Sequence, residues 1–441
     1  MSRPARTGAR VPRIRKTVFP NGLTLVTERC PHFQSLAIGA WVKVGTRDEG
    51  KLEAGMSHFL EHMLFKGTKN RTTLQIAREI DQVGGEFNAF TSREQTCFHL
   101  LLLNRDLGLG MDILGDILLN STFATDEFER ERKVILQEVA MVDESPEEVV
   151  HDLYLEQLYG RHGLGLPILG SAASLRRMKR GDLVRFFRRY YRPKQIVISV
   201  AGDVSHEAVV RAMRPLSRGD WGRGCSPAPA ELSPAPTIRD GFNWVPTPTE
   251  QAHLIWGVPG PRYDAPDRDA AHVLNAYLGG GMSSELFQEI REKRGLAYTV
   301  YSNLSPFRDS GYFSVYVGTA PGQLPLCLKL IEEAATKLCA HELPELELEL
   351  VRDSLKGTIR LSYDSSESRM FNNARNEIHF GQAETLAEIM RRIDAVGPRA
   401  IQRSARKLFA QTRPSILVMG PRLTPALRKK LGNREIKVWK R

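Results

Sequence analysis

The sequence of 441 residues has no apolar run long enough to cross a membrane. Its longest apolar stretches, HLLLLN at 99–104 and QIVISVAGDV at 195–204, fall well short of the roughly 20 residues that a membrane-spanning helix needs. The first 16 residues also lack the apolar core of a secretory signal, although they contain six basic residues and no acidic ones. We therefore expect no membrane span and a frayed basic arm over residues 1–16, with a fragment of an organellar transit peptide as the alternative.

Cysteine is scarce and scattered. The chain has five cysteines without a C-x-x-C pair, at Cys30, Cys97, Cys225, Cys327 and Cys339. An odd number at such distances argues against a disulfide framework and is typical of a reducing compartment. We expect all five to be buried thiols.

The chain also lacks a basic stripe interleaved with aromatic residues. Its formal net charge is +11, but the lysines and arginines are scattered among 51 acidic residues. A nucleic-acid-binding protein is the alternative that this charge suggests, and the scatter favours a solvated, mildly basic surface instead. A hydrophobic content of 41% and a charged content of 26% are ordinary for a globular chain with two or more domains.

The order of predicted elements occurs twice, on either side of a segment rich in Gly, Pro, Ser and Ala at 217–241. In each half a strand leads into a helix, with His58 of the first half opposite His272 of the second. Strands and amphipathic helices then alternate in the same order to the end of each half. The pattern predicts an α+β fold with two homologous domains, each a mainly antiparallel sheet with helices packed on one face. The predicted boundaries are an arm at 1–16, a metal-binding domain at 17–216, a linker at 217–241 and a second domain without a metal site at 242–441.

The stretch HFLEHMLFKGT at 58–68 places three polar groups in an apolar helix. His58 and His62 are four residues apart, so both imidazoles lie on one face of a helix and suit a single zinc ion. Glu61 leans toward the same face and is better placed to hold a water molecule. Buried histidines without a ligand or hydrogen bond would be costly. The alternative is a pair of hydrogen-bonded core histidines.

A second helix offers a third ligand. The stretch TDEFERERKVILQEVAMVDES has Glu131 and Glu138 on one face with apolar residues between them. A catalytic zinc site needs a third protein ligand and an open fourth position. The alternative is that both carboxylates are solvated surface groups.

Four motifs together resemble the pitrilysin, insulin-degrading enzyme and mitochondrial processing peptidase family of inverted-motif zinc peptidases. They are HFLEHMLFKGT, GGEFNAFTSREQT, the stretch from ERKVILQEVAM to DESPEEVVHD, and LGGGMSSELFQEIREKRGLAYTVYS. The likeness runs from about residue 17 to 425 and is strongest to the roughly 50 kDa members similar to processing peptidases.

The resemblance implies a role for each matching residue. It makes His58, His62 and Glu138 the ligands of one zinc ion per chain, Glu61 the general base and Glu131 a supporting carboxylate. It makes Arg291 and Tyr298 the groups that stabilise the transition state, contributed by the partner subunit in related dimers. Substrate contacts are expected from Phe65, Asn88, Ala89, Glu148 and Asp152, the last two holding a substrate arginine upstream of the cut. For Glu148 and Asp152 the alternative is an ordinary solvated helix face.

The implied function is zinc-dependent endopeptidase activity on extended peptides or presequence-like segments. The implied assembly is a homodimer, or a heterodimer with a related subunit, that encloses a chamber. A non-catalytic structural or assembly subunit of the same family is the alternative, and the complete set of motif residues argues against it. We expect no nucleic-acid partner and a cytoplasmic location of the bacterial type, with the mitochondrial matrix as the alternative.

Overall fold

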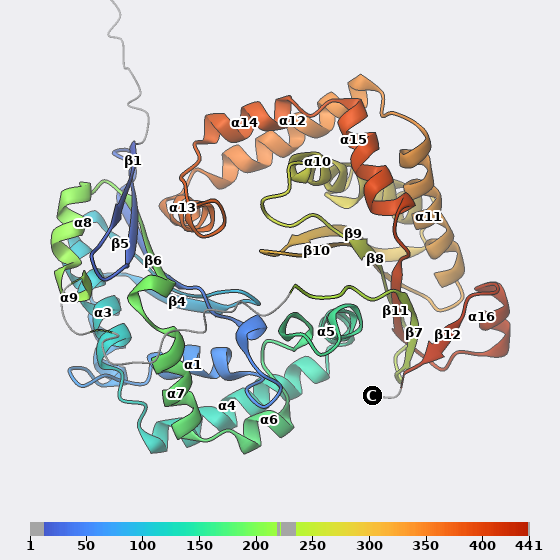
Figure 1. The fold of residues 1–441 in the computed structure, drawn as a ribbon. Coiled ribbons are helices and arrows are strands. Elements are labelled where there is room, and N and C mark those ends of the chain that lie inside the picture. The colour runs from blue at the N-terminus through green and yellow to red at the C-terminus, as the bar shows by residue number, and fades with distance from the viewer. Residues whose placement is uncertain (1–12, 218–220, 222–234, 440–441) are drawn as a thin grey trace, which may run out of the picture.

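The computed structural model describes residues 13–217, 221 and 235–439, and it contains two domains (Figure 1). Each domain is built on a six-stranded mixed sheet. The blue-to-green first domain and the yellow-to-red second domain face each other, and helices lie on their outer sides (Figure 1). Within the described ranges, no helix is both long and apolar enough to span a membrane.

The first sheet has the strand order β1-β2-β6-β3-β5-β4, in which only β2 and β6 pair in parallel. Every residue of the central strand β6 is buried, as expected for a Val- and Ile-rich strand covered on both faces. The strands are β1 (Arg13–Val18), β2 (Thr24–Arg29), β3 (Ser35–Val42), β4 (Glu86–Thr91), β5 (Thr96–Leu103) and β6 (Ile196–Gly202).

The second sheet has the order β12-β7-β11-β8-β10-β9. Leaving out β1 and β12, the two sheets have the same strand order, and the parallel pair β7 and β11 corresponds to β2 and β6. The prediction of two repeated α+β domains is therefore confirmed. The strands are β7 (Gly241–Pro246), β8 (Ala252–Pro259), β9 (Ala297–Pro306), β10 (Gly311–Thr319), β11 (Ser415–Gly420) and β12 (Ile436–Val438).

The helices follow the repeat as well. The first half contains α1 (Met56–Leu64), α2 (Thr73–Asp81), α3 (Leu107–Asn120), α4 (Thr125–Asp143), α5 (Pro146–Tyr159), α6 (Ala172–Arg177), α7 (Arg180–Tyr190), α8 (His206–Ala212) and α9 (Arg214–Ser217). The second contains α10 (Arg268–Gly279), α11 (Leu324–Ala340), α12 (Glu345–Ser362), α13 (Ser366–Phe380), α14 (Leu386–Asp394), α15 (Pro398–Ala405) and α16 (Pro425–Lys430). Short 3₁₀ turns occur at Thr46–Asp48, Asn104–Asp106, Gly163–Gly165 and Pro193–Gln195, and π-helical turns at Phe287–Glu292 and Arg406–Ala410.

The two halves exchange helices. On β3, Ile38 and its alternate neighbours face the main core of the first domain, whereas Trp41 faces a smaller cluster with Met370 of α13. Helix α13 thus covers the face of the first sheet that is turned toward the second domain (Figure 1), and the buried Glu28 accepts a hydrogen bond from Asn373 at 2.8 Å. In the same way α5 packs with Tyr154 against β8 and β11 of the second sheet. Each domain has its own helices on one face of the sheet, and the other face receives a helix from the other half.

Buried charge also joins the halves. The side chain of Arg47, between β3 and α1, is fully buried. Its guanidinium forms an ion pair with Glu94 at 2.8 Å and another with Asp309 in the turn between β9 and β10. Because these carboxylates lie in different domains, the pair fixes the β4–β5 turn to the second domain.

The predicted N-terminal arm ends earlier than expected. Residues 13–16 lie in β1, because they pair with β2 and the side chain of Ile14 packs on the sheet face that α13 covers. Residues 1–12 and most of the predicted linker, 218–220 and 222–234, lie outside the described residues, as does Cys225. Of the other cysteines, Cys339 is only half-buried, and the remaining three are buried free thiols.

Candidate metal centre

The start of helix α1 is held in place by a glycine turn and a buried carboxylate. Gly55, the residue before its first turn, has φ +90°, and a Cβ there would lie 2.6 Å from the carbonyl oxygen of Leu169. The buried carboxylate of Glu49 accepts hydrogen bonds from the backbone N–H of Gly55 at 2.8 Å and of Ser57 at 2.6 Å. Burial raises the pKa of Glu49 to about 7, against these hydrogen bonds. The carboxylate satisfies helix N–H groups that have no partner within the helix.

Helices α1 and α4 bring three ligand-type side chains together. One atom each of His58, His62 and Glu138 lies within 4.8 Å of the others. The Oε2 atom of Glu138 is 3.9 Å from Nε2 of His58 and 3.6 Å from Nε2 of His62. In the described part of the chain this is the only group of three or more such residues that could hold a metal ion.

The charge state of the cluster suits a metal. Burial, together with the neighbouring His62, lowers the pKa of His58 to about 3, so His58 is neutral and its ring can offer a lone pair. Its Nδ1 atom is buried and has no hydrogen-bond partner among the described residues. The imidazoles of His58 and His62 and the carboxylate of Glu138 are side chains of the types that bind zinc in catalytic sites. The residues present therefore fit a zinc ion.

Glu131 contacts the ring nitrogen of His62 that points away from Glu138. Its Oε2 atom is 3.0 Å from Nδ1 of His62, and its Oε1 atom is 2.8 Å from Nζ of Lys66. Burial opposes ionisation of Glu131, but the hydrogen bonds from His62 and Lys66 outweigh it and lower its pKa. Burial also opposes the charged form of His62, and the hydrogen bond to Glu131 and the charge of Glu138 outweigh it and raise the pKa of His62. A proton held on Nδ1 by Glu131 leaves Nε2 free to face Glu138.

Glu61 lies on the same helix and is tied to strand β4. The hydroxyl of Thr91 donates a hydrogen bond to Oε2 of Glu61 at 2.6 Å. Burial raises the pKa of Glu61, against this hydrogen bond. A carboxylate with a raised pKa takes up a proton more readily near neutral pH than an exposed one does.

Strand β4 carries the predicted substrate-binding residues Asn88 and Ala89. It forms the edge of the first sheet, and its only paired neighbour among the described strands is β5. Asn88 is exposed and Ala89 is partly buried. Phe65, just after α1, packs against Phe87 of β4 with ring centroids 4.6 Å apart. The structure thus brings Phe65 and the edge of β4 close to α1, the helix that carries the candidate metal ligands His58 and His62.

The two acids predicted to hold a substrate arginine have different surroundings. Asp152 accepts a hydrogen bond from Arg93 at 3.0 Å, so it is already engaged by a guanidinium of this chain. Glu148, one turn earlier on α5, is exposed.

Arg291 and Tyr298 lie together in the second half. The guanidinium of Arg291 stacks 4.8 Å from the ring centroid of Tyr298, whose side chain is 77% exposed. Among the described contacts, none joins either residue to the ligand cluster of the same chain. The structure therefore groups the predicted residues into two sets, one in each half.

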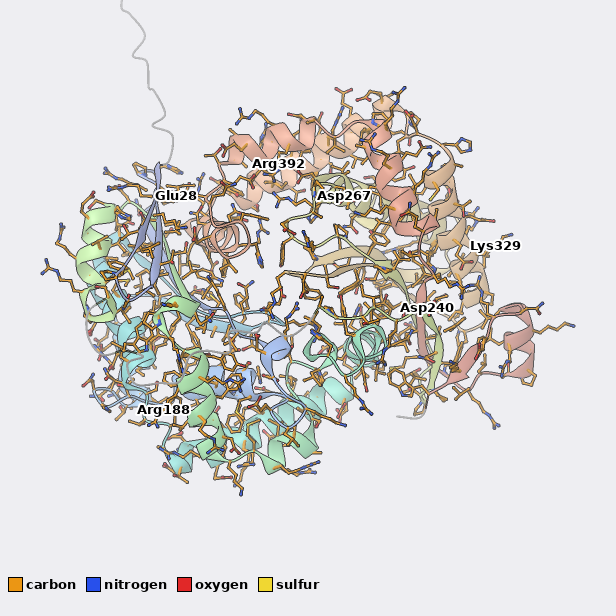
Figure 2. The ribbon with its side chains drawn as sticks, viewed as in Figure 1. Glu28, Arg188, Asp240, Asp267, Lys329 and Arg392 are labelled. Carbon is orange, nitrogen blue, oxygen red and sulfur yellow. The ribbon has the colours of Figure 1, made fainter. Side chains whose placement is uncertain are left out.

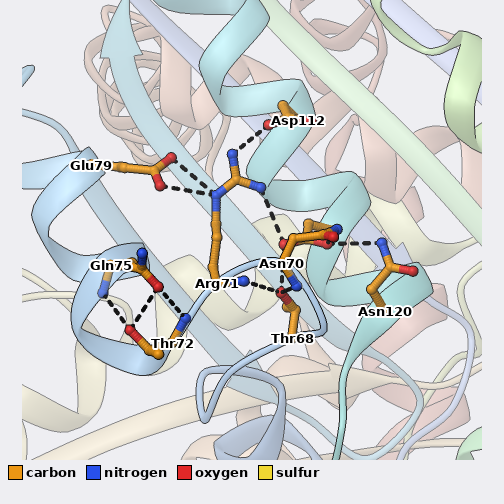
Figure 3. Close-up of polar contacts among 9 residues, drawn as sticks. Thr68, Asn70, Arg71, Thr72, Gln75, Glu79, Asp112 and Asn120 are labelled. Atoms are coloured by element: carbon orange, nitrogen blue, oxygen red, sulfur yellow. Dashed lines mark hydrogen bonds and ion pairs between the residues drawn. The ribbon is translucent and has the colours of Figure 1, made fainter.

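The loop after α1 is fixed by a polar network around Arg71 (Figure 3). The Nε atom of Arg71 donates to Glu79 at 3.0 Å, and its terminal nitrogens contact Asp112 and the buried Asp116 of α3. Thr68 donates to the same Asp116 at 2.6 Å. Carboxylates therefore anchor both the start of α1 and the loop that follows it.

Models of known families match most of the chain. Residues 24–172 match the model described as insulinase, peptidase family M16, and residues 177–355 match the model described as the peptidase M16 inactive domain. The chain belongs to peptidase family M16.

Named M16-type relatives match over nearly the whole chain. An uncharacterized zinc protease of Mycobacterium leprae is 40% identical over 92% of this chain and 91% of its own length. The uncharacterized zinc protease YmxG of Bacillus subtilis is 36% identical over 90% of this chain and 96% of its own length.

Solved structures share the fold. A crystal structure of a peptidase M16 inactive domain from Pseudomonas fluorescens has a TM-score of 0.86 at 20% identity and covers 93% of this chain and 99% of its own. A protease from Helicobacter pylori has a TM-score of 0.84 at 22% identity, with coverage of 93% and 100%.

Three residues at this M16 site escaped the sequence-based predictions. Thr91 follows Ala89 by two positions, so strand alternation could have placed it on the same side of β4 as a candidate. Lys66 follows His62 by one helical turn, but its partner Glu131 is far away in sequence. Glu49 gave no local signal, because its role as a helix cap depends on how the intervening loop folds back.

Proposed function

We propose that this M16 protein is a zinc-dependent endopeptidase that hydrolyses extended peptides or presequence-like segments. The observation that carries the proposal is the convergence of His58, His62 and Glu138 from two helices to within 4.8 Å, beside Glu61. The zinc protease names of relatives at 36–40% identity support the choice of metal.

His58, His62 and Glu138 would hold the zinc ion, with Glu131 orienting His62. When bound, zinc supplies Lewis-acid activation of water and of the peptide carbonyl. Glu61 accepts the proton from the attacking water and passes it to the leaving amine. Its raised pKa favours this exchange, and Thr91 holds its carboxylate in place.

Arg291 and Tyr298 would stabilise the negative charge that develops on the scissile carbonyl oxygen. Their placement in the other half of the chain, with Tyr298 exposed, supports a role that requires closure of the halves or a second copy. We therefore propose a dimer, of identical or related subunits, that encloses a chamber.

The substrate would bind as an additional strand along the free edge of β4, with its backbone beside Asn88 and Ala89. Main-chain pairing tolerates many sequences, and Phe65 would contact the residue after the cut. Because Asp152 is paired with Arg93, Glu148 is the better acid for an upstream arginine, with Asp152 contributing if Arg93 moves. A cytoplasmic location of the bacterial type fits the free cysteines and the bacterial relatives.

The alternative is a non-catalytic assembly subunit. The family description of an inactive domain covers residues 177–355, which lie outside the ligand cluster. The second half has Asn275 and Ala276 where the first has Glu61 and His62, so the metal-binding chemistry belongs to the first half alone.

A quenched fluorescent peptide, assayed with and without a chelator, tests the proposal. We expect cleavage that is lost with the chelator and restored by zinc. The variant Glu61→Gln should keep its zinc by metal analysis and lose turnover, because a carboxamide cannot accept the proton. Glu129→Gln, which changes an exposed glutamate of α4, serves as the control and should stay active. Full activity of Glu61→Gln would remove the general base from the proposal, and a purified chain without bound metal would refute the whole.

A further inference from the structure

A cavity lies in the second half of the chain, between α10, α12, α13 and α14. Its volume is about 410 Å³, and its lining includes no residue of the ligand cluster. Figure 2 labels Arg392 on α14, at the rim of this cavity, and Asp267 just before α10. We call it the α13–α14 pocket. Much of its wall is apolar, formed by Leu304, Leu355, Ile359, Phe380 and Ile393.

The rim of the α13–α14 pocket carries more positive than negative charge. Arg392 donates to Asp269 at 2.9 Å and forms a second ion pair with Glu384, and Arg268 lies 3.7 Å from Asp269. The two carboxylates of the lining are thus taken up by two of its three guanidinium groups. Arg375, the third, has no carboxylate within ion-pair distance in the part of the chain that the structure describes. Its guanidinium hydrogen-bonds to the amide oxygen of Asn372 at 2.6 Å and is otherwise exposed.

The pKa of His272, which also lines the pocket, is affected by the same positive charges. Burial lowers the pKa of His272, and the charges of Arg375, Arg268 and Arg392 lower it further, against Asp269. Three guanidinium groups thus act on one point of the wall, and the field there disfavours another cation. An anion would be attracted to the same place.

A buried donor next to Arg375 in the sequence lacks a partner within the described ranges. Asn376 is 2% exposed and lines the α13–α14 pocket, and its Nδ2 atom has no hydrogen-bond acceptor among the described residues. A buried polar group without a partner costs about 1–3 kcal/mol, so such groups are usually satisfied by a ligand or water. Arg375 and Asn376 are consecutive residues of α13 and both line the α13–α14 pocket, so its wall offers a guanidinium and an amide N–H.

We propose that the α13–α14 pocket binds a carboxylate carried on an apolar group, as at the C-terminus of a peptide that ends in leucine. The carboxylate oxygens would accept hydrogen bonds from Arg375 and Asn376, a fork that suits two oxygens. The apolar side chain would lie on the Leu355 and Ile359 wall. A fatty acid has the same two features, and it would place its carboxylate at Arg375 and Asn376 and its apolar chain on the Leu355 and Ile359 wall.

This site is independent of the proposed peptidase activity, because it requires neither zinc nor Glu61. Helix α13 also covers the first sheet, with the hydroxyl of Ser199 on β6 donating to the carbonyl of Met370 at 2.8 Å. An occupant of the α13–α14 pocket would therefore contact an element that both domains share.

The test measures fluorescence anisotropy of a labelled peptide ending in leucine, with either a free or an amidated C-terminus. The full-length Glu61→Gln chain is used so that hydrolysis does not consume the probe. We expect the free acid to bind about tenfold more tightly than the amide, since a hydrogen bond to a charged group contributes about that much. Arg375→Gln should reduce this preference to within about twofold. Arg391→Gln, an exposed arginine of α14 outside the pocket, is the matched control and should retain it.

Competition by decanoate identifies the source of the carboxylate. In one outcome, decanoate binds about tenfold more weakly to Arg375→Gln, and the peptides show no preference for the free acid. This outcome would support the pocket with a fatty acid as its occupant. Equal affinity for the acid and the amide, together with decanoate binding that ignores Arg375→Gln, would overturn the proposal.

Discussion

Replacing Glu131 by glutamine isolates its effect on His62 without changing the shape of the site. Glu131 is 5% exposed and receives two donors, Nδ1 of His62 at 3.0 Å and Nζ of Lys66 at 2.8 Å. A carboxamide has one acceptor oxygen, so it can serve only one of these donors, and its NH₂ group meets the other. The charge that holds the proton on Nδ1 is also lost.

The expected consequence is weaker metal binding. Loss of a group that orients a metal-ligating histidine typically costs 10- to 100-fold in affinity or activity, or about 1.4–2.8 kcal/mol. We therefore expect the zinc Kd of Glu131→Gln to rise by about that factor. At saturating zinc, part of the peptidase activity should return, because the three ligands are still present.

Competition with a chelator of known affinity measures the zinc Kd, and a quenched peptide measures hydrolysis at several zinc concentrations. Glu129→Gln, on the exposed side of the same helix, controls for the loss of one charge. Thermal unfolding of the metal-free proteins separates a folding defect from a metal defect. A zinc Kd for Glu131→Gln within about twofold of the wild type would refute the reasoning.

Two further predictions concern stability. Burial lowers the pKa of His379 to about 4, so between pH 6.5 and 4 the unfolded chain binds more protons than the folded one and stability falls as pH falls. In urea unfolding, His379 should reduce the free energy of unfolding by about 2 kcal/mol between pH 7.5 and 5, and the variant His379→Gln should lack this reduction. An equal reduction in both proteins would contradict the prediction. Arg47→Leu should lower the free energy of unfolding by about 3 kcal/mol or more, because it removes a fully buried guanidinium, takes from Asp309 its ion-pair partner and leaves the mostly buried Glu94 with only its contacts to Arg308 among the described residues. Arg15→Leu breaks an exposed pair with Glu207 and should lower the free energy of unfolding far less than Arg47→Leu does, and a similar loss in both variants would contradict the role of burial.

The sequence predicted the repeated fold because the relevant signals are local. Strand alternation and amphipathic helix periods recur in the same order in both halves, and the structure confirms two sheets with one strand order. The spacing of His58 and His62 is local as well, since four residues make about one helical turn. The pairing of His62 with Glu138 needed the motif resemblance, because 76 residues separate them, and the structure places the three ligand atoms together.

Tertiary structure alone decided the contacts between segments far apart in the chain. The exchange of α5 and α13 between the sheets, and the extension of β1 into the predicted arm, depend on which apolar faces and sheet edges remain uncovered once the strands have paired. The Thr91 bond to Glu61, the Glu49 cap on α1 and the burial of Asn376 Nδ2, which has no partner among the described residues, also arise from packing. Sequence periodicity reports which face of an element is apolar, whereas the partner of a buried polar group is set by the path of the whole chain.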